Sequence, residues 1–512
     1  MTAISPLTAP AREALVPAPR ALAEPGDAPG VPDATSTTLT LGQSGGEAAA
    51  YSLAQLSPTP VWERSARDAV SSRMAANVQG ARLGNRFDGL GAALLERFRF
   101  DGNDFSQSVI RLPAGTPVDR VDDARFHAPA DNEIALTVTT RGGATVAVTL
   151  GSDADRLSVR IAVTGGELSE DERTALAALS DGFQQAIDGL AKVPPRLDLA
   201  GVLRFDGEAL SSVSLHATVQ VGHDKRQTID LVADDKRRSL TASGALGTIA
   251  MDVDVTGAAI VGNEAQRQAA LTRYLHTFDQ AQRRGQGDAD LMALFKDGFG
   301  ALHGNMPAVA ATAQATRLGA GDQGMLTGLA DFSASVTQTR RSENPLRSDE
   351  VDAFSYRVSQ QTEVRGSGPL DRTIRQRQEA TLDASFHRSL TPDTTLLLDA
   401  SRHSQNYAYE RIHDTASSDM TLAYEQGVLA KASLTQSASE WQRTQTYRFG
   451  KLEEDSTVPS SRSRTIDVLA LVRAAEESDA FGRMDDDARR DRVLADMHDQ
   501  VLLQTDPARL AR

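Results

Sequence analysis

The chain of 512 residues contains no cysteine, and this absence excludes several classes of site at once. Without thiols there can be no disulfide scaffold, thiolate zinc finger, iron–sulfur cluster or cysteine nucleophile. Aromatic residues are also scarce, at 5% of the chain. Asp and Glu (69) outnumber Lys and Arg (54), which gives a net charge of −15. Proteins that bind nucleic acid need clustered basic residues to neutralise phosphates, so no nucleic-acid partner is expected.

Long apolar runs are missing as well. A membrane-spanning helix needs about 20 consecutive apolar residues, and no segment approaches this length, so no membrane span is expected. In the first 50 residues, Pro6, Pro10 and Arg12 interrupt the apolar stretches, which argues against a secretory signal peptide. We expect a disordered Pro/Ala-rich tail and a cytoplasmic protein. Such a tail would also suit export without a cleavable signal through a bacterial type III or flagellar-type apparatus.

Apolar and polar residues begin to alternate at Ile134, which is the pattern of β-strands with one buried face. A three-residue Gly-rich turn should bring the chain back, pairing Val138 with Val146 and Leu136 with Val148. A third alternating run follows. This region therefore predicts an antiparallel meander with one face in solvent.

Ser169 and Glu172 have the spacing of a capping box, which predicts that an amphipathic helix begins at residue 170. More alternating runs and helical patterns follow, and the second half of the chain repeats this order. Strands followed by helices, twice, indicate an α+β fold. We expect two antiparallel β-sheet modules of consecutive hairpins, each followed or backed by amphipathic helices.

Shifts in composition suggest the domain boundaries. The expected parts are the disordered tail at 1–55, a helical lead-in with the first antiparallel sheet and its helices at 56–303, a linker at 304–330, the second antiparallel sheet at 331–463 and C-terminal helices at 464–512.

Two hairpins define the expected second sheet. Residues 382–387 (LDASFH) nearly repeat at 398–403 (LDASRH), with a turn signal at 391–393, so we expect these two runs to pair. Another hairpin should turn at 425–427 in a three-residue loop with a bulge at Gly427.

Three short motifs suggest chemistry, and each has a simpler explanation. Residues 42–46 (GQSGG) match the G-x-S-x-G nucleophile elbow, but no buried strand or βα unit surrounds them, which favours a flexible linker. Residues 319–324 (GAGDQG) fit G-x-G-x-x-G without the core strand that a dinucleotide site needs. Residues 101–104 resemble a calcium loop that lacks its final glutamate. The nine histidines show no metal-ligand spacing, so we assign no catalytic residue, cofactor or metal.

The aromatic residues of the second half are out of phase with the apolar residues of their expected strands. Either a bulge returns them to the core, or they stand on the polar face. In the second case Tyr407, Tyr409, Trp441 and Tyr447 would form a patch for a ligand or a partner.

Regular hairpins without a catalytic constellation favour a non-enzymatic binding or structural protein built on antiparallel sheets. Its partner would be a protein or a small molecule, and the sequence indicates neither its identity nor an oligomeric state. One variant is a curled sheet that encloses a hydrophobic ligand. The alternatives are an exported bacterial protein and a hydrolase whose carboxylates the sequence does not group.

Overall fold

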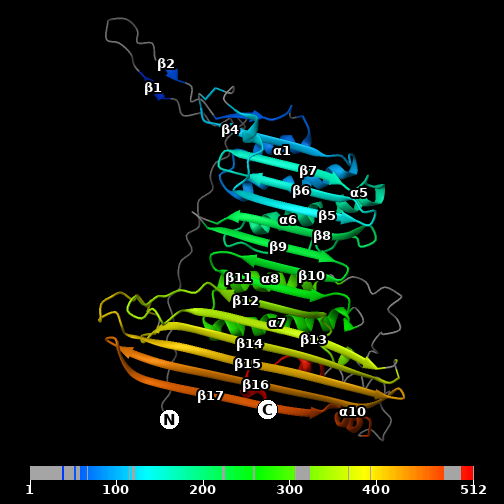
Figure 1. The fold of residues 1–512 in the computed structure, drawn as a ribbon, viewed down its shortest axis with the longest axis vertical. Coiled ribbons are helices and arrows are strands. Elements are labelled where there is room, and N and C mark those ends of the chain that lie inside the picture. The colour runs from blue at the N-terminus through cyan, green and yellow to red at the C-terminus, as the bar shows by residue number, and fades with distance from the viewer. Residues whose placement is uncertain are drawn as a thin grey trace, which may run out of the picture. The chain divides into compact units, whose positions relative to one another are not determined.

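A computed structural model of the chain shows one long antiparallel β-sheet with the longer helices on one of its faces (Figure 1). The structure describes residues 37–39, 51–53, 58–65, 67–114, 116–117, 121–221, 225–257, 260–304, 306, 323–366, 368, 370–392, 394–477 and 497–510. Residues 1–57 form a separate unit, in which β1 (Thr37–Leu39) pairs with β2 (Tyr51–Leu53). All other described elements belong to the unit formed by residues 58–512.

The large sheet has 15 strands. In chain order they are β3 (Thr59–Trp62), β4 (Phe105–Leu112), β5 (Asn132–Thr140), β6 (Thr145–Ser152), β7 (Arg156–Thr164), β8 (Leu210–Gln220), β9 (Arg226–Asp234), β10 (Arg237–Ser243), β11 (Gly247–Asp254), β12 (Asp331–Gln338), β13 (Ala353–Gly366), β14 (Arg372–Ser389), β15 (Tyr407–Glu425), β16 (Val428–Arg448) and β17 (Lys451–Asp467). From β8 to β17 each strand pairs with the next one in the chain. On the other side β8 pairs with β5, and β6, β7, β4 and β3 continue the sheet from there.

The described helices are α1 (Ala69–Asn77), α2 (Leu83–Phe87), α3 (Leu90–Glu96), the 3-10 helix η1 (Arg97–Arg99), α4 (Asp123–Phe126), α5 (Glu170–Ala178), α6 (Ser180–Leu190), α7 (Glu264–Gly285), α8 (Ala289–His303), α10 (Val468–Glu477) and α12 (Pro507–Leu510). Figure 1 shows the larger helices behind the sheet. We call the opposite face the outer face. Within the described segments, no helix is both long enough and apolar enough to cross a membrane.

The predicted meander is confirmed in its register. Val138 lies opposite Val146 and Leu136 opposite Val148, with β7 as the third strand. The predicted capping box is confirmed too, since the Ser169 hydroxyl accepts from the backbone of Glu172 and the Glu172 carboxylate accepts from the backbone of Ser169. These short-range features follow from turn length and helix-end chemistry, which neighbouring residues determine.

The prediction of two separate sheet modules is not confirmed. Strands β11 and β12 pair along eight residues, from Gly247 opposite Gln338 to Asp254 opposite Asp331. The sheet therefore continues directly from the first half of the chain to the second. Most of the expected linker, residues 307–322, lies outside the described residues.

The expected hairpin of residues 382–387 with 398–403 is wrong. Strand β14 pairs with β15 instead, and Ser385 lies opposite Arg411. Residues 398–403 belong to the loop between these strands. The near-repeat misled the prediction because β14 ends at Ser389 and the returning strand begins only at Tyr407, after the second copy of the repeat.

The turn at 425–427 also differs from the prediction. It contains two residues, because Glu425 pairs directly with Val428. Gln426 and Gly427 both have positive φ angles, 52° and 80°, as a type I′ turn requires. The irregularity lies beyond the loop, because Ala423 pairs with Lys431 and Tyr424 with Leu429, which leaves Ala430 of β16 as the extra residue of a bulge.

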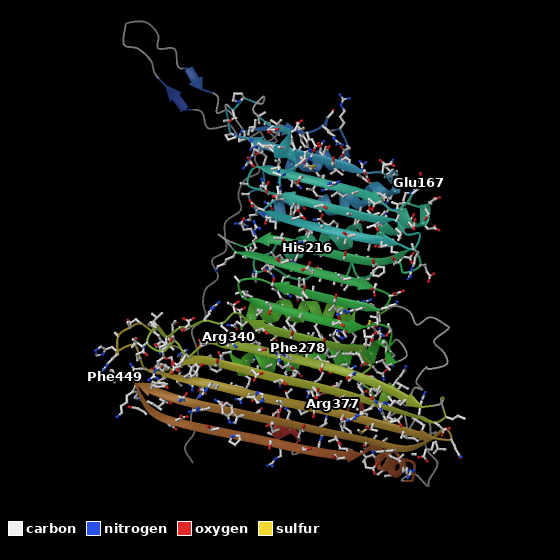
Figure 2. The ribbon with its side chains drawn as sticks, viewed as in Figure 1. Glu167, His216, Phe278, Arg340, Arg377 and Phe449 are labelled. Atoms are coloured by element: carbon white, nitrogen blue, oxygen red, sulfur yellow. The ribbon has the colours of Figure 1, made fainter. Side chains whose placement is uncertain are left out.

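Strands β13 to β17 are the longest and widen the sheet at this end (Figure 1). Arg340 and Phe449 lie at one end of these strands, and Arg377 lies toward the other (Figure 2). Buried and more exposed side chains alternate along β13, β14 and much of β15, so their apolar set packs under the helices, whereas β17 is exposed along nearly its whole length. The outer face carries small polar residues such as Thr137, Ser214 and Ser335.

The C-terminal segment, residues 497–506, lies across β14, β15 and β16 on the helix-covered face. Gln378 and Ser418 donate hydrogen bonds of 2.9 and 2.8 Å to the backbone carbonyl of Val501. The amide of Gln436 donates to the carbonyls of Gln500 (2.8 Å) and Leu502 (3.2 Å). Residues 497–501 are helical, and the carbonyls at such a helix end have no partner within the helix, so polar side chains on an otherwise apolar sheet face satisfy them.

Candidate ligand-binding site

Three of the aromatic residues singled out in the sequence lie together. The pairing of β15 with its neighbours is regular from Tyr407 to Ala423, so Tyr407 and Tyr409 point to the outer face, opposite to Ile412. Tyr447 of β16 lies beside Tyr407, with the two rings stacked at 5.0 Å between centroids. We call Tyr407, Tyr409 and Tyr447 the tyrosine cluster.

The tyrosine cluster is buried although it lies on the outer face. The three residues are 0%, 6% and 4% exposed, and Leu396 and Leu398 of the β14–β15 loop pack against them. Of the two alternatives derived from the sequence, the second is right about the face, because the rings stand on the outer face, but they are covered there and not open to solvent. Trp441 lies six positions from Tyr447 along β16, opposite His413, and is half-buried.

The segment before β13 covers the tyrosine cluster. The hydroxyl of Tyr407 donates a 2.6 Å hydrogen bond to Glu350 and accepts one of 2.9 Å from Asn344. The hydroxyl of Tyr409 donates to the backbone carbonyl of Val351 at 3.1 Å. The phenol groups of Tyr407 and Tyr409 therefore fasten this segment to the sheet.

His387 of β14 lies between two carboxylates in the same region, at 2.6 Å from Asp352 and 3.1 Å from Glu350. Burial alone would lower the pKa of His387, but the hydrogen bonds with Asp352 and Glu350 outweigh it and raise this pKa to about 9. Burial would raise the pKa of Glu350, but the bonds from His387 and Tyr407 hold it below its usual value. The charges of His387, Asp352 and Glu350 therefore balance one another, and their contacts hold this segment against the sheet. A docking role for Tyr407, Tyr409, Trp441 and Tyr447 remains a prediction.

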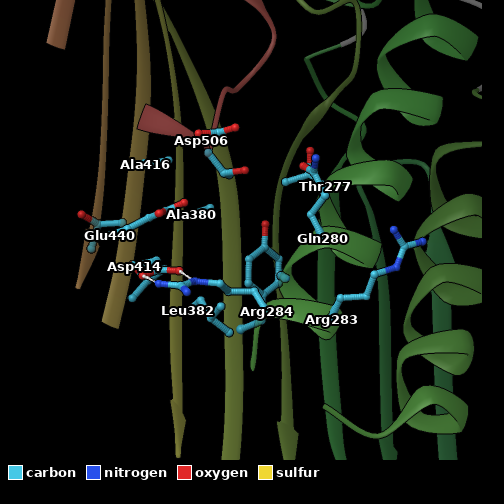
Figure 3. Close-up of a pocket in the computed structure, with 15 residues that line it drawn as sticks. Thr277, Gln280, Arg283, Arg284, Ala380, Leu382, Asp414, Ala416, Glu440 and Asp506 are labelled. Carbon is cyan, nitrogen blue, oxygen red and sulfur yellow. Dashed lines mark hydrogen bonds and ion pairs between the residues drawn. The ribbon is translucent and has the colours of Figure 1, made fainter. Parts of the chain in front are cut away.

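A cavity of about 290 Å³ lies on the other face, between α7, strands β13 to β16 and the C-terminal segment (Figure 3). Its lining includes Arg284, Leu382, Asp414, Ala416, Glu440 and Asp506. Elements separated by more than 200 residues in the chain thus meet in one site. Its volume suits a small ligand, because pockets for drug-sized molecules begin at roughly 300 Å³.

Arg284 of α7 reaches the floor of the cavity and binds Asp414 of β15, with 3.0 Å between Nε and Oδ2 (Figure 3). The same guanidinium donates a 2.6 Å hydrogen bond to Gln442, whose amide donates to Glu410 at 2.9 Å. Arg388 pairs with the other oxygen of Glu410 at 2.8 Å. The positive charge of Arg284 is therefore already balanced within the wall of the cavity.

Glu440 of β16 lies directly opposite Asp414 and also lines the cavity. Its side chain makes no hydrogen bond or ion pair with the residues that the structure describes. Burial raises the pKa of Glu440, and the negative charges of Asp414 and Asp506 raise it further against the opposing effect of Arg284. Glu440 is thus a carboxyl group held in the cavity without a partner.

Tyr356 of β13 adds a second free polar group to the lining. The residue is 2% exposed, and its hydroxyl has no hydrogen-bond partner among the described residues. Its ring packs edge-on against Phe278, at 5.8 Å between centroids. Burial raises the pKa of this phenol, so the hydroxyl keeps its proton and remains a donor at neutral pH.

Other candidate motifs carry no site in the described structure. Asp101 pairs with Arg97 at 3.1 Å, and Asp104 accepts a 2.7 Å hydrogen bond from the backbone of Val163, so both act within the fold. Across the described part of the chain, no three His, Asp or Glu side chains are grouped as a metal ion requires. Residues 42–46 and 319–322 lie outside the described residues.

The sequence did contain one signal for the cavity. Asp414 and Glu440 are charged residues at positions where the alternation of β15 and β16 places apolar ones, such as Ala416 and Ala438. Both side chains are half-buried, and carboxylates on the core-facing side of a strand mark functional positions more often than surface charges do. The phase of these strands is needed to see this signal.

Comparison with known proteins does not assign the chain to a family. No family model, no curated protein and no solved structure shows a significant match to it.

Proposed function

We propose that the chain is a non-enzymatic binding protein and that its ligand occupies the cavity between α7 and β13 to β16. The observation that supports this proposal is a pair of polar groups in the lining of one cavity, the buried hydroxyl of Tyr356 and the half-buried carboxyl of Glu440, neither of which has a hydrogen-bond partner among the described residues. Buried polar groups without partners cost stability and are rare in native proteins. A ligand that pairs with both groups would offset that cost.

The surroundings of the cavity suit recognition of a small molecule. The floor belongs to long paired strands, and one wall belongs to α7, so the polar groups are held on rigid elements. Ala380, Leu382 and Ala416 supply apolar contact area. A few fixed polar groups within an apolar lining are typical of ligand sites.

A ligand-observed NMR screen with a library of small soluble compounds tests this function. In the variant Ala416→Phe the new ring should fill part of the cavity and abolish binding of the compounds that bind the wild type. Ala250→Phe, at an exposed position on the outer face of β11, is the matched control and should bind as the wild type does. Binding that survives in Ala416→Phe, or no binding compound at all, would contradict the proposal.

A second candidate function is hydrolysis by paired carboxylates. Asp414 forms an ion pair with Arg284, whereas burial raises the pKa of Glu440, so the two carboxyl groups stand in different environments, as a general base and a general acid do. Turnover of a bound ester, amide or glycoside, lost in Glu440→Gln, would favour this candidate. A ligand that binds and is recovered unchanged would favour the binding protein.

The export of a bacterial protein through residues 1–50 is a separate proposal, since most of this segment lies outside the described residues. Deletion of residues 1–50 should abolish secretion from a host that carries a type III or flagellar-type apparatus. Unchanged secretion, or a wild-type protein that stays in the cytoplasm of that host, would contradict export by this segment.

A further inference from the structure

The charges around the cavity are unequal. Among the described residues three carboxylates line it, and two of them have partners: Asp414 binds Arg284 at 3.0 Å, and Asp506 pairs with Arg509 at 3.6 Å. Asp506 also accepts a 2.8 Å hydrogen bond from the backbone of Ala508, at the start of α12. Glu440 is the remaining carboxylate, so the group still available to a ligand is acidic.

The nearby basic residues do not cancel this acidity. Arg284 is already bound to Asp414 and Gln442. Arg283 is exposed, and in Figure 3 its side chain extends away from Glu440. In the part of the chain that the structure describes, a ligand anion would meet Glu440 and Asp414 with no unpaired cation pointing at them, whereas a ligand cation would meet two carboxylates.

The rest of the lining sets the shape of the ligand. Leu382 and Ala416 offer hydrocarbon surface next to Asp414, which suits a short alkyl chain. Tyr356 offers a protonated hydroxyl, which can donate to an oxygen on the ligand. An ammonium group carries three donors on a compact centre and can bond to Glu440 while it is attracted by Asp414.

We propose, resting on the binding function above, that the cavity selects a small primary amine with a short apolar chain, with the ammonium at Glu440 and a hydroxyl or carbonyl oxygen of the ligand at Tyr356. The geometry that carries this inference is the placement of Glu440, Asp414 and Tyr356 in the lining of one small cavity. The site is a subsite for one cationic group beside an apolar wall.

Four probes of nearly equal size test the inference in NMR titrations: n-butylamine, 4-amino-1-butanol, n-butanol and butyrate. We expect 4-amino-1-butanol to bind most tightly, n-butylamine next, n-butanol weakly and butyrate not at all. In Glu440→Gln both amines should bind at least about tenfold more weakly, the size of one lost charge-assisted hydrogen bond, while n-butanol should be unaffected. In Tyr356→Phe only the advantage of 4-amino-1-butanol over n-butylamine should disappear.

Glu379→Gln is the matched control, because Glu379 is a carboxylate on the outer face of β14 that pairs with Arg377. It should leave all four affinities unchanged. Amines that bind no better than n-butanol, or equally well to Glu440→Gln, would overturn the inference, as would a loss of binding in Glu379→Gln. If library compounds of another class still bind and Ala416→Phe blocks them, the binding function stands and only the amine assignment fails.

Discussion

His387 and Glu350, 37 residues apart in the chain, are joined by a 3.1 Å contact between a ring nitrogen and a carboxylate oxygen beneath the segment that covers the tyrosine cluster. Their side chains are 2% and 5% exposed. Asp352 binds the other ring nitrogen at 2.6 Å, and the rings of Tyr407 and Tyr409 lie about 5 Å away. Solvent therefore screens this charge arrangement very little.

This arrangement should make stability depend on pH. The pKa of His387 is about 9 in the folded protein and 6.5 without the fold, so its stabilisation is fully present below pH 6.5 and is lost as the pH rises through 9. The difference corresponds to about 3 kcal/mol at most. The gap in melting temperature between the wild type and His387→Gln should therefore be largest near pH 6.5 and should shrink toward pH 9.5. A gap that is independent of pH would contradict this prediction.

His413 provides the control for the His387 experiment. It contacts Asp383 at the same distance, 2.6 Å, but both side chains are more than half exposed. Exposed ion pairs contribute about 1 kcal/mol or less, because water screens them. His413→Gln should therefore change the melting temperature little at any pH in this range.

Two buried tyrosines should respond in opposite ways to loss of the hydroxyl. Tyr274 donates a 2.9 Å hydrogen bond to Gln378, whereas the hydroxyl of Tyr356 has no partner among the described residues. Tyr274→Phe should lower the free energy of unfolding by about 1 kcal/mol, and Tyr356→Phe should leave it unchanged or raise it. Urea titrations without added ligand measure both. A destabilised Tyr356→Phe would show that the hydroxyl is already paired in the free protein.

The predictions from sequence succeeded where neighbouring residues determine the structure. The register of Val138 with Val146 depends on a short turn, and the start of α5 depends on Ser169 and Glu172, three residues apart. Both interactions form within one hairpin or one helical turn. Local spacing is sufficient information for such features.

The predictions from sequence failed where contacts between residues far apart in the chain determine the structure. The sheet continues across β11 and β12 because their edges pair, although 76 residues separate Asp254 from Asp331 and no periodicity records such pairing. The sequence did not show that Tyr407 and Tyr409 are buried. Their alternation places them on the outer face, and the segment that covers them there precedes β13 in the chain. The cavity needs Arg284, Asp414 and Glu440 together, which only the assembled sheet provides.

The attachment of the C-terminal segment should depend on Gln436. This side chain is fully buried, and its amide serves the carbonyls of Gln500 and Leu502. Gln436→Leu leaves both carbonyls without that donor, which should cost about 2 kcal/mol. Hydrogen exchange measured by mass spectrometry should then accelerate in peptides covering 497–510. Gln361→Leu, at an exposed position of β13, should not change this exchange, and equal protection in both variants would contradict the prediction.

Two helical glycines should respond with opposite signs to replacement by alanine. A Cβ atom at Gly182 in α6 would lie 2.4 Å from the backbone carbon of Gly201, and a backbone cannot move aside as a flexible side chain can. A Cβ atom at Gly300 in α8 would meet nothing within 4 Å among the described residues. Alanine favours a helix over glycine by about 1 kcal/mol, so Gly300→Ala should be stabilising. Gly182→Ala gains the same preference but forces α6 away from Gly201, and overpacking of this kind costs about 1–3 kcal/mol. Urea titrations should therefore give a higher unfolding midpoint for Gly300→Ala and a lower one for Gly182→Ala. If both variants shifted the midpoint upward, α6 and the backbone at Gly201 would not be in contact in solution.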